Sequence, residues 1–319
     1  MKSRTRVVVI LPHISNEIWT FIYTKFKLIY NHIMKNQDPS QEQLQSVLNL
    51  YTHGKLQQAL SESSQMLERF PNSVVLYNIS GASNAALKRF DAAIDSYKQA
   101  LRIKPDYAEV HNNMGNALSI KGDLAEAIES YKKALRIKPN FAGAYNNMAN
   151  AMKNKGDLAE AIESCKQALK IKPDYADAYY NMGVALNDKG DPEAAIESYK
   201  QALRIKPDYA DAYNNMGSAL KDKGDLEEAI DNYKQALRIK PDYAEGHSNL
   251  GAALQLLNQT EQALASYEKA ISLKKDLNTA ISGLGMALLK KGEHSEGLDK
   301  LRQGDGSILF NIKSGLSIK

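Results

Sequence analysis

The stretch IKPDYADAYYNMGVALNDKGDPEAAIESYKQALR, residues 171–204, is repeated along the chain with a spacing of 34 residues. The motif IKPDYA begins at Ile103, Ile171, Ile205 and Ile239, and the variant IKPNFA begins at Ile137. A Gly-Asp pair recurs in step, with its glycine at positions 122, 156, 190 and 224. Self-similarity at a fixed period of this length indicates a repeat architecture.

Each repeat contains the start and stop signals of two helices. An aspartate before the first helix, such as Asp174, is expected to cap it by accepting from free backbone N–H groups. Gly190 and its counterparts are expected to end this helix in the left-handed conformation. Asp191 is then expected to cap the second helix, and the proline of the next IKP motif to stop it. Each repeat is therefore predicted to be a helical hairpin.

The apolar residues of a repeat form one stripe on each predicted helix. In residues 176–209 the first stripe holds Tyr179, Met182, Gly183 and Leu186, and the second holds Ala195, Tyr199 and Ala202. These spacings place each set on one helix face, and the small residues permit close approach of two helix backbones. A single hairpin cannot bury both stripes, so neighbouring hairpins are expected to stack into an all-α solenoid.

This pattern resembles the tetratricopeptide repeat (TPR), which has an aromatic residue, Leu or Met, Gly and Leu on its first helix, followed by Ala, Tyr, Ala and Pro within 34 residues. The resemblance implies a right-handed superhelix of helix-turn-helix units that binds other polypeptides. Residues 74–277 carry six copies, at 74–107, 108–141, 142–175, 176–209, 210–243 and 244–277. Degenerate copies flank them at 40–73 and, as a capping unit, at 278–306.

The two ends of the chain depart from the repeat. Residues 1–39 are expected to be a poorly structured leader or an upstream extension before Met34, and a weak targeting segment is a further alternative. Its apolar run, Val7–Leu11, is shorter than a signal sequence or a membrane span requires. Residues 307–319 form a tail whose alternating pattern favours either a short β-hairpin or an apolar flap over the last helix.

One asparagine recurs two residues after the aromatic of each first helix, at Asn113, Asn147, Asn181, Asn215 and Asn249. A second often precedes it, at Asn112, Asn146 and Asn214. A carboxamide offers both a donor and an acceptor, which complements a peptide unit. The TPR regions of O-linked N-acetylglucosamine transferases carry a similar asparagine ladder, and this resemblance implies peptide-backbone binding in the concave groove. The alternative is that the asparagines persist by recent duplication of one ancestral unit or hydrogen-bond within their own hairpin.

Catalytic and metal chemistry find little support in the sequence. His111 and His247 replace the tyrosine of the first stripe and are interpreted as packing residues, and no histidine pair has metal-ligand spacing. Cys165 is the only cysteine and replaces the tyrosine of the second stripe, so neither a disulfide nor a cysteine-based zinc site is expected. We therefore expect no catalytic residues, no metal and no cofactor.

Charge disfavours nucleic acid as a partner. The net charge of +4 resides in residues 1–33, while residues 34–319 contain equal numbers of acidic and basic residues. The leading hypothesis is a cytoplasmic, non-catalytic adaptor that holds an extended segment of a partner protein. Two alternatives remain: an accessory arm acting in trans for a glycosyltransferase or sulfotransferase, and a scaffold that self-associates through its solenoid ends.

Overall fold

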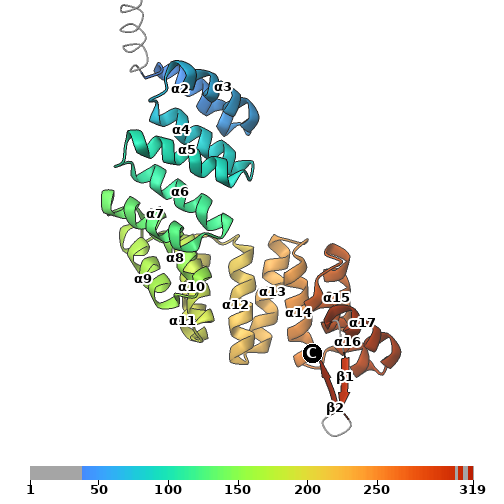
Figure 1. Cartoon of the computed structure of the whole chain (residues 1–319). Helices are drawn as coiled ribbons and strands as arrows, with labels where there is room; N and C mark the ends of the chain where they lie inside the picture. Colours follow the sequence, from blue (N-terminus) through green and yellow to red (C-terminus); the bar gives the residue numbers. More distant parts are fainter. Residues whose placement is uncertain (1–37, 306–307, 312–314, 319) are drawn as a thin grey trace, which may run out of the picture. The chain divides into compact units, whose positions relative to one another are not determined.

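A computed structural model describes residues 38–305, 308–311 and 315–318. These residues form sixteen helices, α2 to α17, and two short strands. The chain divides into two compact units, Met1–Ile137 and Lys138–Lys319, which are described separately. Figure 1 shows that both units are built from helices arranged in consecutive pairs. The repeating helical hairpin predicted from the sequence is thus confirmed.

The first unit contains three helical hairpins. In each hairpin the two helices pack on each other, and the second helix then packs on the first helix of the next hairpin. Its helices are α2 (Gln41–Thr52), α3 (Leu56–Arg69), α4 (Val74–Ala86), α5 (Phe90–Ile103), α6 (Ala108–Lys121) and α7 (Leu124–Ile137).

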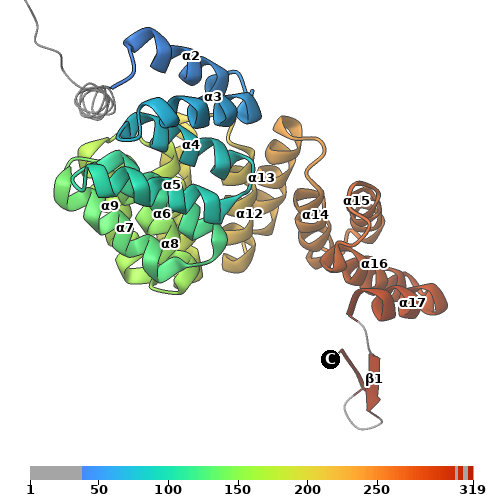
Figure 2. The same cartoon turned by 45° about the horizontal axis from the view of Figure 1, so that its top comes forward.

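The second unit contains five helical hairpins stacked in the same order, followed by a β-hairpin (Figure 2). The first helices of neighbouring hairpins also contact one another. Its helices are α8 (Ala142–Lys155), α9 (Leu158–Ile171), α10 (Ala176–Asp188), α11 (Pro192–Ile205), α12 (Ala210–Lys223), α13 (Leu226–Ile239), α14 (Ala244–Leu256), α15 (Thr260–Leu273), α16 (Asn278–Lys291) and α17 (His294–Asp305).

A glycine on the first helix and a tyrosine on the second form the core contact of most hairpins. Tyr199 is 1% exposed, and a Cβ atom added to Gly183 would lie 2.6 Å from its Cε1 atom. The same distance is 2.5–2.8 Å in the pairs formed by glycines 81, 115, 217 and 251. Such separations are below van der Waals contact, so the tyrosine ring occupies the space that a side chain on the first helix would need.

The hairpin of α8 and α9 fills the same position differently. Ala149 stands in place of the glycine and Cys165 in place of the tyrosine, and both are buried, with exposures of 1% and 0%. In the hairpin of α2 and α3 the pair is Val47 and Ser63, both 0% exposed. In these two hairpins a larger residue at the glycine position of the first helix is accompanied by a smaller residue at the tyrosine position of the second helix. The total side-chain volume at the two positions is thus limited, which explains why the aromatic ring is absent there.

The helix ends agree with the sequence only in part. The first helices of the 108–141, 142–175 and 210–243 repeats end at glycines in the left-handed region, as predicted, with φ of 102° at Gly122 and 97° at Gly224. The expected aspartate caps at their starts were wrong, because Tyr175 and its counterparts occupy the N-cap position without a side-chain cap bond. Asp174 lies one residue too early to reach the free N–H groups.

The second helix α11 has a side-chain cap of the kind predicted. Asp191 accepts a hydrogen bond from the backbone N–H of Ala194 at 3.1 Å. Asp157 also occupies the N-cap position but makes no cap bond. Its carboxylate instead pairs with Lys155 Nζ at 2.6 Å, so a lysine at the end of α8 competes for the group that would have capped α9.

The strands β1 (Ile308–Asn311) and β2 (Gly315–Ile318) pair antiparallel after α17. Ile308 lies opposite Ile318, and Asn311 opposite Gly315. Of the two alternatives that the alternating sequence left open, the structure contains the β-hairpin. The leader predicted over residues 1–39 lies almost wholly outside the described residues.

Candidate functional site

The asparagines singled out from the sequence form two columns on the first helices. The ladder column consists of partly buried residues: in the first unit Asn113 on α6, and in the second unit Asn147, Asn181, Asn215 and Asn249 on α8, α10, α12 and α14. The inner column consists of the residues one position earlier. Three of its asparagines are buried, with exposures of 8% at Asn112, 7% at Asn146 and 5% at Asn214, and Asn78 is partly buried. The ladder column is therefore the one that reaches the surface.

Ladder residues donate hydrogen bonds to the inner column of the preceding hairpin. In the first unit, Asn113 Nδ2 donates to Asn78 Oδ1 at 3.1 Å. In the second unit, Asn181 Nδ2 donates to Asn146 Oδ1 at 2.9 Å, and Asn249 Nδ2 donates to Asn214 Oδ1 at 3.0 Å. Each bond joins residues 35 positions apart, so the columns connect neighbouring hairpins within a unit.

Further contacts restrict the orientation of these amides. Asn112 Nδ2 donates to the Oδ1 atom of Asn113 on the same helix, at 3.4 Å. Asn214 Nδ2 donates to the Oδ1 atom of Asn215 on the same helix, at 3.2 Å. Each ladder amide that donates to the inner column still has a second N–H and a carbonyl lone pair. These remaining groups are what a ligand could use.

Tyr180 interrupts the inner column, and the sequence analysis missed it. Its hydroxyl accepts a hydrogen bond from Asn215 Nδ2 at 3.0 Å, in place of the amide oxygen found in other hairpins. Its ring lies 4.9 Å from the ring of Tyr209 and 6.1 Å from that of Tyr199, measured between centroids. Burial raises its pKa, and nearby Asp211 adds to the effect, so the hydroxyl stays protonated. The signal in the sequence was a tyrosine where neighbouring repeats carry asparagine.

Acidic residues lie at the start of several first helices. In the second unit these are Asp177, Asp211 and Glu245. Glu245 pairs with Lys274 Nζ at 2.9 Å. This ion pair lowers the pKa of Glu245. An acidic edge disfavours ligands that offer a free carboxylate, because like charges repel.

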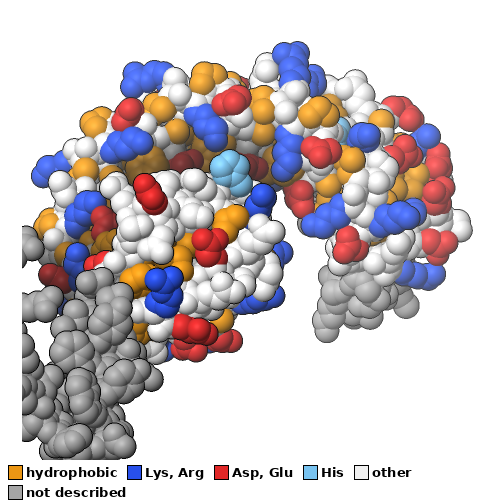
Figure 3. All heavy atoms as spheres, turned by 90° about the horizontal axis from the view of Figure 1, so that it is seen from above, with side chains coloured by type: hydrophobic (Ala, Val, Ile, Leu, Met, Phe, Trp, Pro, Cys, Tyr) orange, Lys and Arg blue, Asp and Glu red, His pale blue; other side chains and the backbone are white. Residues whose placement is uncertain are grey.

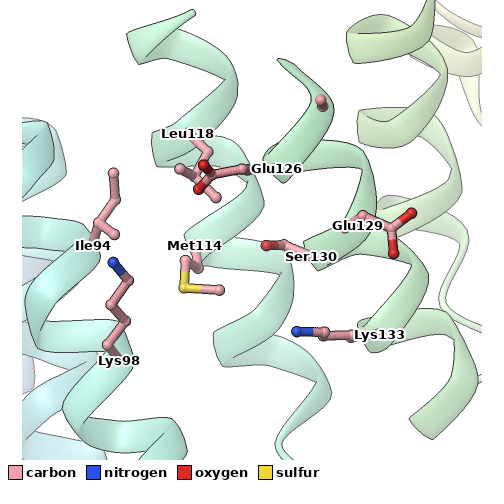
Figure 4. A pocket seen from close by; sticks show the side chains of 9 residues that line it. Ile94, Lys98, Met114, Leu118, Glu126, Glu129, Ser130 and Lys133 are labelled. Carbon is pink, nitrogen blue, oxygen red and sulfur yellow. The ribbon is translucent and has the colours of Figure 1, made fainter. Parts of the chain in front are cut away.

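A cavity of about 390 Å³ lies in the first unit, apart from the asparagine columns (Figure 4). The side chains of Ile94, Met114 and Leu118 line it, and Lys98 and Lys133 lie beside it. Its remaining lining comes from Ala125, Glu126, Glu129 and Ser130 on α7. Since its charged residues include both signs, the cavity does not favour a ligand of one charge.

The histidines and the cysteine of the sequence analysis lie in packed positions. His111 is 7% exposed, and its Nε2 atom lies 2.9 Å from the carbonyl oxygen of Pro105. His247 makes the same contact with Pro241 at 3.1 Å. Burial raises the pKa of the Cys165 thiol to about 12, which leaves it protonated at neutral pH. These contacts agree with the prediction that the three residues serve packing.

The surface and composition of the described residues limit other functions. Figure 3 shows basic and acidic side chains interspersed over the face in view. Among the described residues, no three His, Cys, Asp or Glu side chains are grouped so that they could hold a metal ion. None of the helices in the described part of the chain is long and apolar enough to cross a membrane.

Individual proteins similar to this chain were found in sequence and in structure. A probable UDP-N-acetylglucosamine–peptide N-acetylglucosaminyltransferase from Arabidopsis thaliana is 38% identical over 74 residues, which are 23% of this chain and only 8% of that protein. The crystal structure of the APC/C hetero-tetramer Cut9–Hcn1 matches with a TM-score of 0.65 at 18% identity, over 76% of this chain and 48% of that chain. The crystal structure of MamA matches 52% of this chain and 96% of that chain, at 32% identity and a TM-score of 0.47.

Family profiles match most of the repeat region. The profile described as TPR repeat matches residues 84–120, 115–156, 154–190, 185–224 and 217–258. The profile described as tetratricopeptide repeat matches residues 244–277. Together they cover the chain from residue 84 to residue 277, and the Cut9–Hcn1 match supports the same fold. The chain therefore belongs to the tetratricopeptide repeat family, whose helical hairpin arrays serve as protein-interaction scaffolds.

Proposed function

We propose that this protein is a non-catalytic adaptor whose ladder asparagines bind the backbone of an extended segment of a partner protein. The observation that carries the proposal is the pair of columns: the inner amides are buried and hydrogen-bonded, whereas the ladder amides reach the surface. Asn112, Asn146 and Asn214 then support the ladder, and Asn113, Asn147, Asn181, Asn215 and Asn249 contact the ligand.

The hydrogen-bonding capacity of the ladder suits a peptide backbone. Each ladder amide that donates one N–H to its neighbour, as Asn181 and Asn249 do, retains a donor and an acceptor. A solvent-competed hydrogen bond contributes about 0.5–1.5 kcal/mol. The four ladder contacts of the second unit together contribute about 2–6 kcal/mol, and the entropy of ordering a peptide reduces this sum, so the backbone contacts alone give an expected Kd of about millimolar. Selectivity between partners would then come from side chains around the ladder, including the acidic edge.

Capture of partners from the protein's own cell extract tests this proposal. The full chain is compared with a variant in which Asn147, Asn181 and Asn215 are changed to alanine. A matched control changes Asn140 and Asn154, two exposed asparagines outside the columns. Partners held by the parent and the control but lost by the ladder variant support the proposal. Partners held equally by all three place binding elsewhere and contradict it.

A second candidate is an accessory arm that recruits substrates in trans for a glycosyltransferase. The observation that favours it is the 38% identity of a 74-residue segment to a plant protein named as a probable N-acetylglucosaminyltransferase. Co-purification of the full chain with a sugar-transferring enzyme would support this role. Partners that bind without such an enzyme would count against it.

The cytoplasmic location and self-association through the solenoid ends remain proposals. A single cysteine, Cys165, suits a reducing compartment, and fractionation of cells with an antibody to the protein tests this. Self-association is tested by light scattering. A mass of 35.4 kDa that stays constant over a wide concentration range would contradict it.

A further inference from the structure

Asn113, Asn181, Asn215 and Asn249 each donate a hydrogen bond to a residue 35 positions earlier, and that acceptor restricts the orientation of the amide. In three hairpin contacts the acceptor is an amide oxygen, on Asn78, Asn146 or Asn214. An exposed asparagine side chain can rotate about its terminal torsion, so a fixed acceptor decides which edge of the amide is directed at the surface. The inner column therefore controls what the ladder column offers to a ligand.

The contact between α10 and α12 uses a different acceptor. Here Asn215 Nδ2 donates to the hydroxyl of Tyr180 at 3.0 Å. The Tyr180 ring packs against Tyr209 and Tyr199, with centroid distances of 4.9 and 6.1 Å, so its hydroxyl is held at the end of a packed ring. Removing the hydroxyl alone would leave the packing unchanged and free one N–H of Asn215.

From this geometry we infer that Tyr180 is a positioning residue for Asn215. Its phenol hydroxyl accepts one N–H of the Asn215 amide, and Asn214 Nδ2 donates to the Asn215 Oδ1 atom at 3.2 Å, so the second N–H and one lone pair of Asn215 are left for a ligand. The inference rests on the proposed function, since it explains how one member of the ladder is kept in its binding orientation. It adds a residue that the asparagine pattern alone does not identify.

The first test needs no ligand. The side-chain amide signal of Asn215 is followed by NMR in the parent and in the Tyr180→Phe and Tyr180→Asn variants. The signal is identified by its loss in Asn215→Ala. Tyr180→Phe is expected to shift it and speed its hydrogen exchange, whereas Tyr180→Asn, which restores the amide acceptor of the other hairpins, keeps exchange close to the parent. An unchanged signal in Tyr180→Phe would overturn the inference.

The second test measures binding of a neutral peptide, Ac-(Ser-Gly-Thr)5-NH2, by NMR titration. Tyr180→Phe and Asn215→Ala are each expected to weaken binding about two- to tenfold, the size of one exposed hydrogen bond. The double variant is expected to be no weaker than Asn215→Ala, because both changes remove the same contact. Losses that multiply in the double variant would contradict the positioning role.

A control separates this inference from the proposed function. Tyr213→Phe removes a hydroxyl from α12 itself and is expected to leave peptide binding unchanged. If the parent does not bind the peptide at all, the proposed function fails, and the ligand-free NMR comparison alone decides whether Tyr180 orients Asn215. If Tyr180→Phe frees the amide but binding stays at the parental level while Asn215→Ala loses it, the orientation has no role and the inference fails.

Discussion

Replacing Cys165 with tyrosine, the residue of the other complete repeats, should destabilise the hairpin of α8 and α9. The partner of Cys165 is Ala149, whereas the tyrosines of other hairpins face glycine. A Cβ atom at those glycines would lie 2.5–2.8 Å from the nearest ring carbon. A tyrosine introduced at position 165 would meet the real Cβ of Ala149 at about such a distance, and overpacking of this kind costs about 1–3 kcal/mol.

Changing Ala149 to glycine in the same protein should rescue the tyrosine variant. Ala149→Gly alone is expected to cost about 1 kcal/mol, because glycine is a poor helix former. In the double variant the clash is gone, and burial of the larger ring contributes about 1.5–3 kcal/mol. The double variant should therefore be about 0.5–2 kcal/mol more stable than the parent, although each single change destabilises.

Native-state hydrogen exchange of backbone amides in α8 and α9 is the suitable assay, because helical arrays can open one hairpin at a time. A reverse cycle at Gly183 and Tyr199 serves as the control. Gly183→Ala should destabilise the hairpin of α10 and α11, and Tyr199→Cys in the same protein should recover part of the loss. If the loss of stability in both double variants equals the sum of the losses in the single variants, the two positions do not compensate each other in volume and the reasoning is refuted.

Three further predictions concern helix ends and a buried histidine. Gly156→Ala should lower the free energy of unfolding by about 1 kcal/mol, because φ is 95° at this residue. Gly143→Ala, in the helix that Gly156 terminates, should raise it by about 0.5–1 kcal/mol, because an added Cβ would meet its nearest neighbour at 3.4 Å. Urea unfolding measures both changes. Asp191→Ala should lower the free energy of unfolding by about 1 kcal/mol, because its cap bond is lost. Asp157→Ala should lower it by less than about 0.5 kcal/mol, because its ion pair with Lys155 is exposed. Thermal unfolding of the two variants checks this order. Burial lowers the pKa of His111 from 6.5, so the unfolded chain binds a proton at a higher pH than the folded chain does. The free energy of unfolding should therefore fall as pH drops below about 6.5. His111→Tyr should make the free energy of unfolding depend less on pH between pH 7 and pH 5.

The features that the sequence predicted correctly depend on one repeat at a time. The helical hairpin and the terminating glycines such as Gly122 follow from residue spacing within a repeat. Helix periodicity and the special backbone freedom of glycine are local rules, so no knowledge of neighbouring hairpins was needed.

The features that were missed depend on atoms from two hairpins or on competition between partners. The acceptor for Asn215 is 35 positions away on Tyr180, a contact that arises only when α10 and α12 are stacked. Asp157 occupies its N-cap position as predicted, yet Lys155 engages its carboxylate. The cavity lined by Ile94 and Met114 likewise forms between elements of successive repeats.

The central claim is that the ladder asparagines bind a peptide backbone, and a titration of two neutral peptides tests it most directly. The first is Ac-(Ser-Gly-Thr)5-NH2, and the second carries an ester in place of the N–H at each glycine. The parent should bind the first at least tenfold more tightly than the ester analogue, and the variant with alanine at Asn147, Asn181 and Asn215 should lose at least tenfold in affinity for the first peptide. Equal affinity of the parent for both peptides, or equal binding of the first peptide by parent and variant, would contradict the claim.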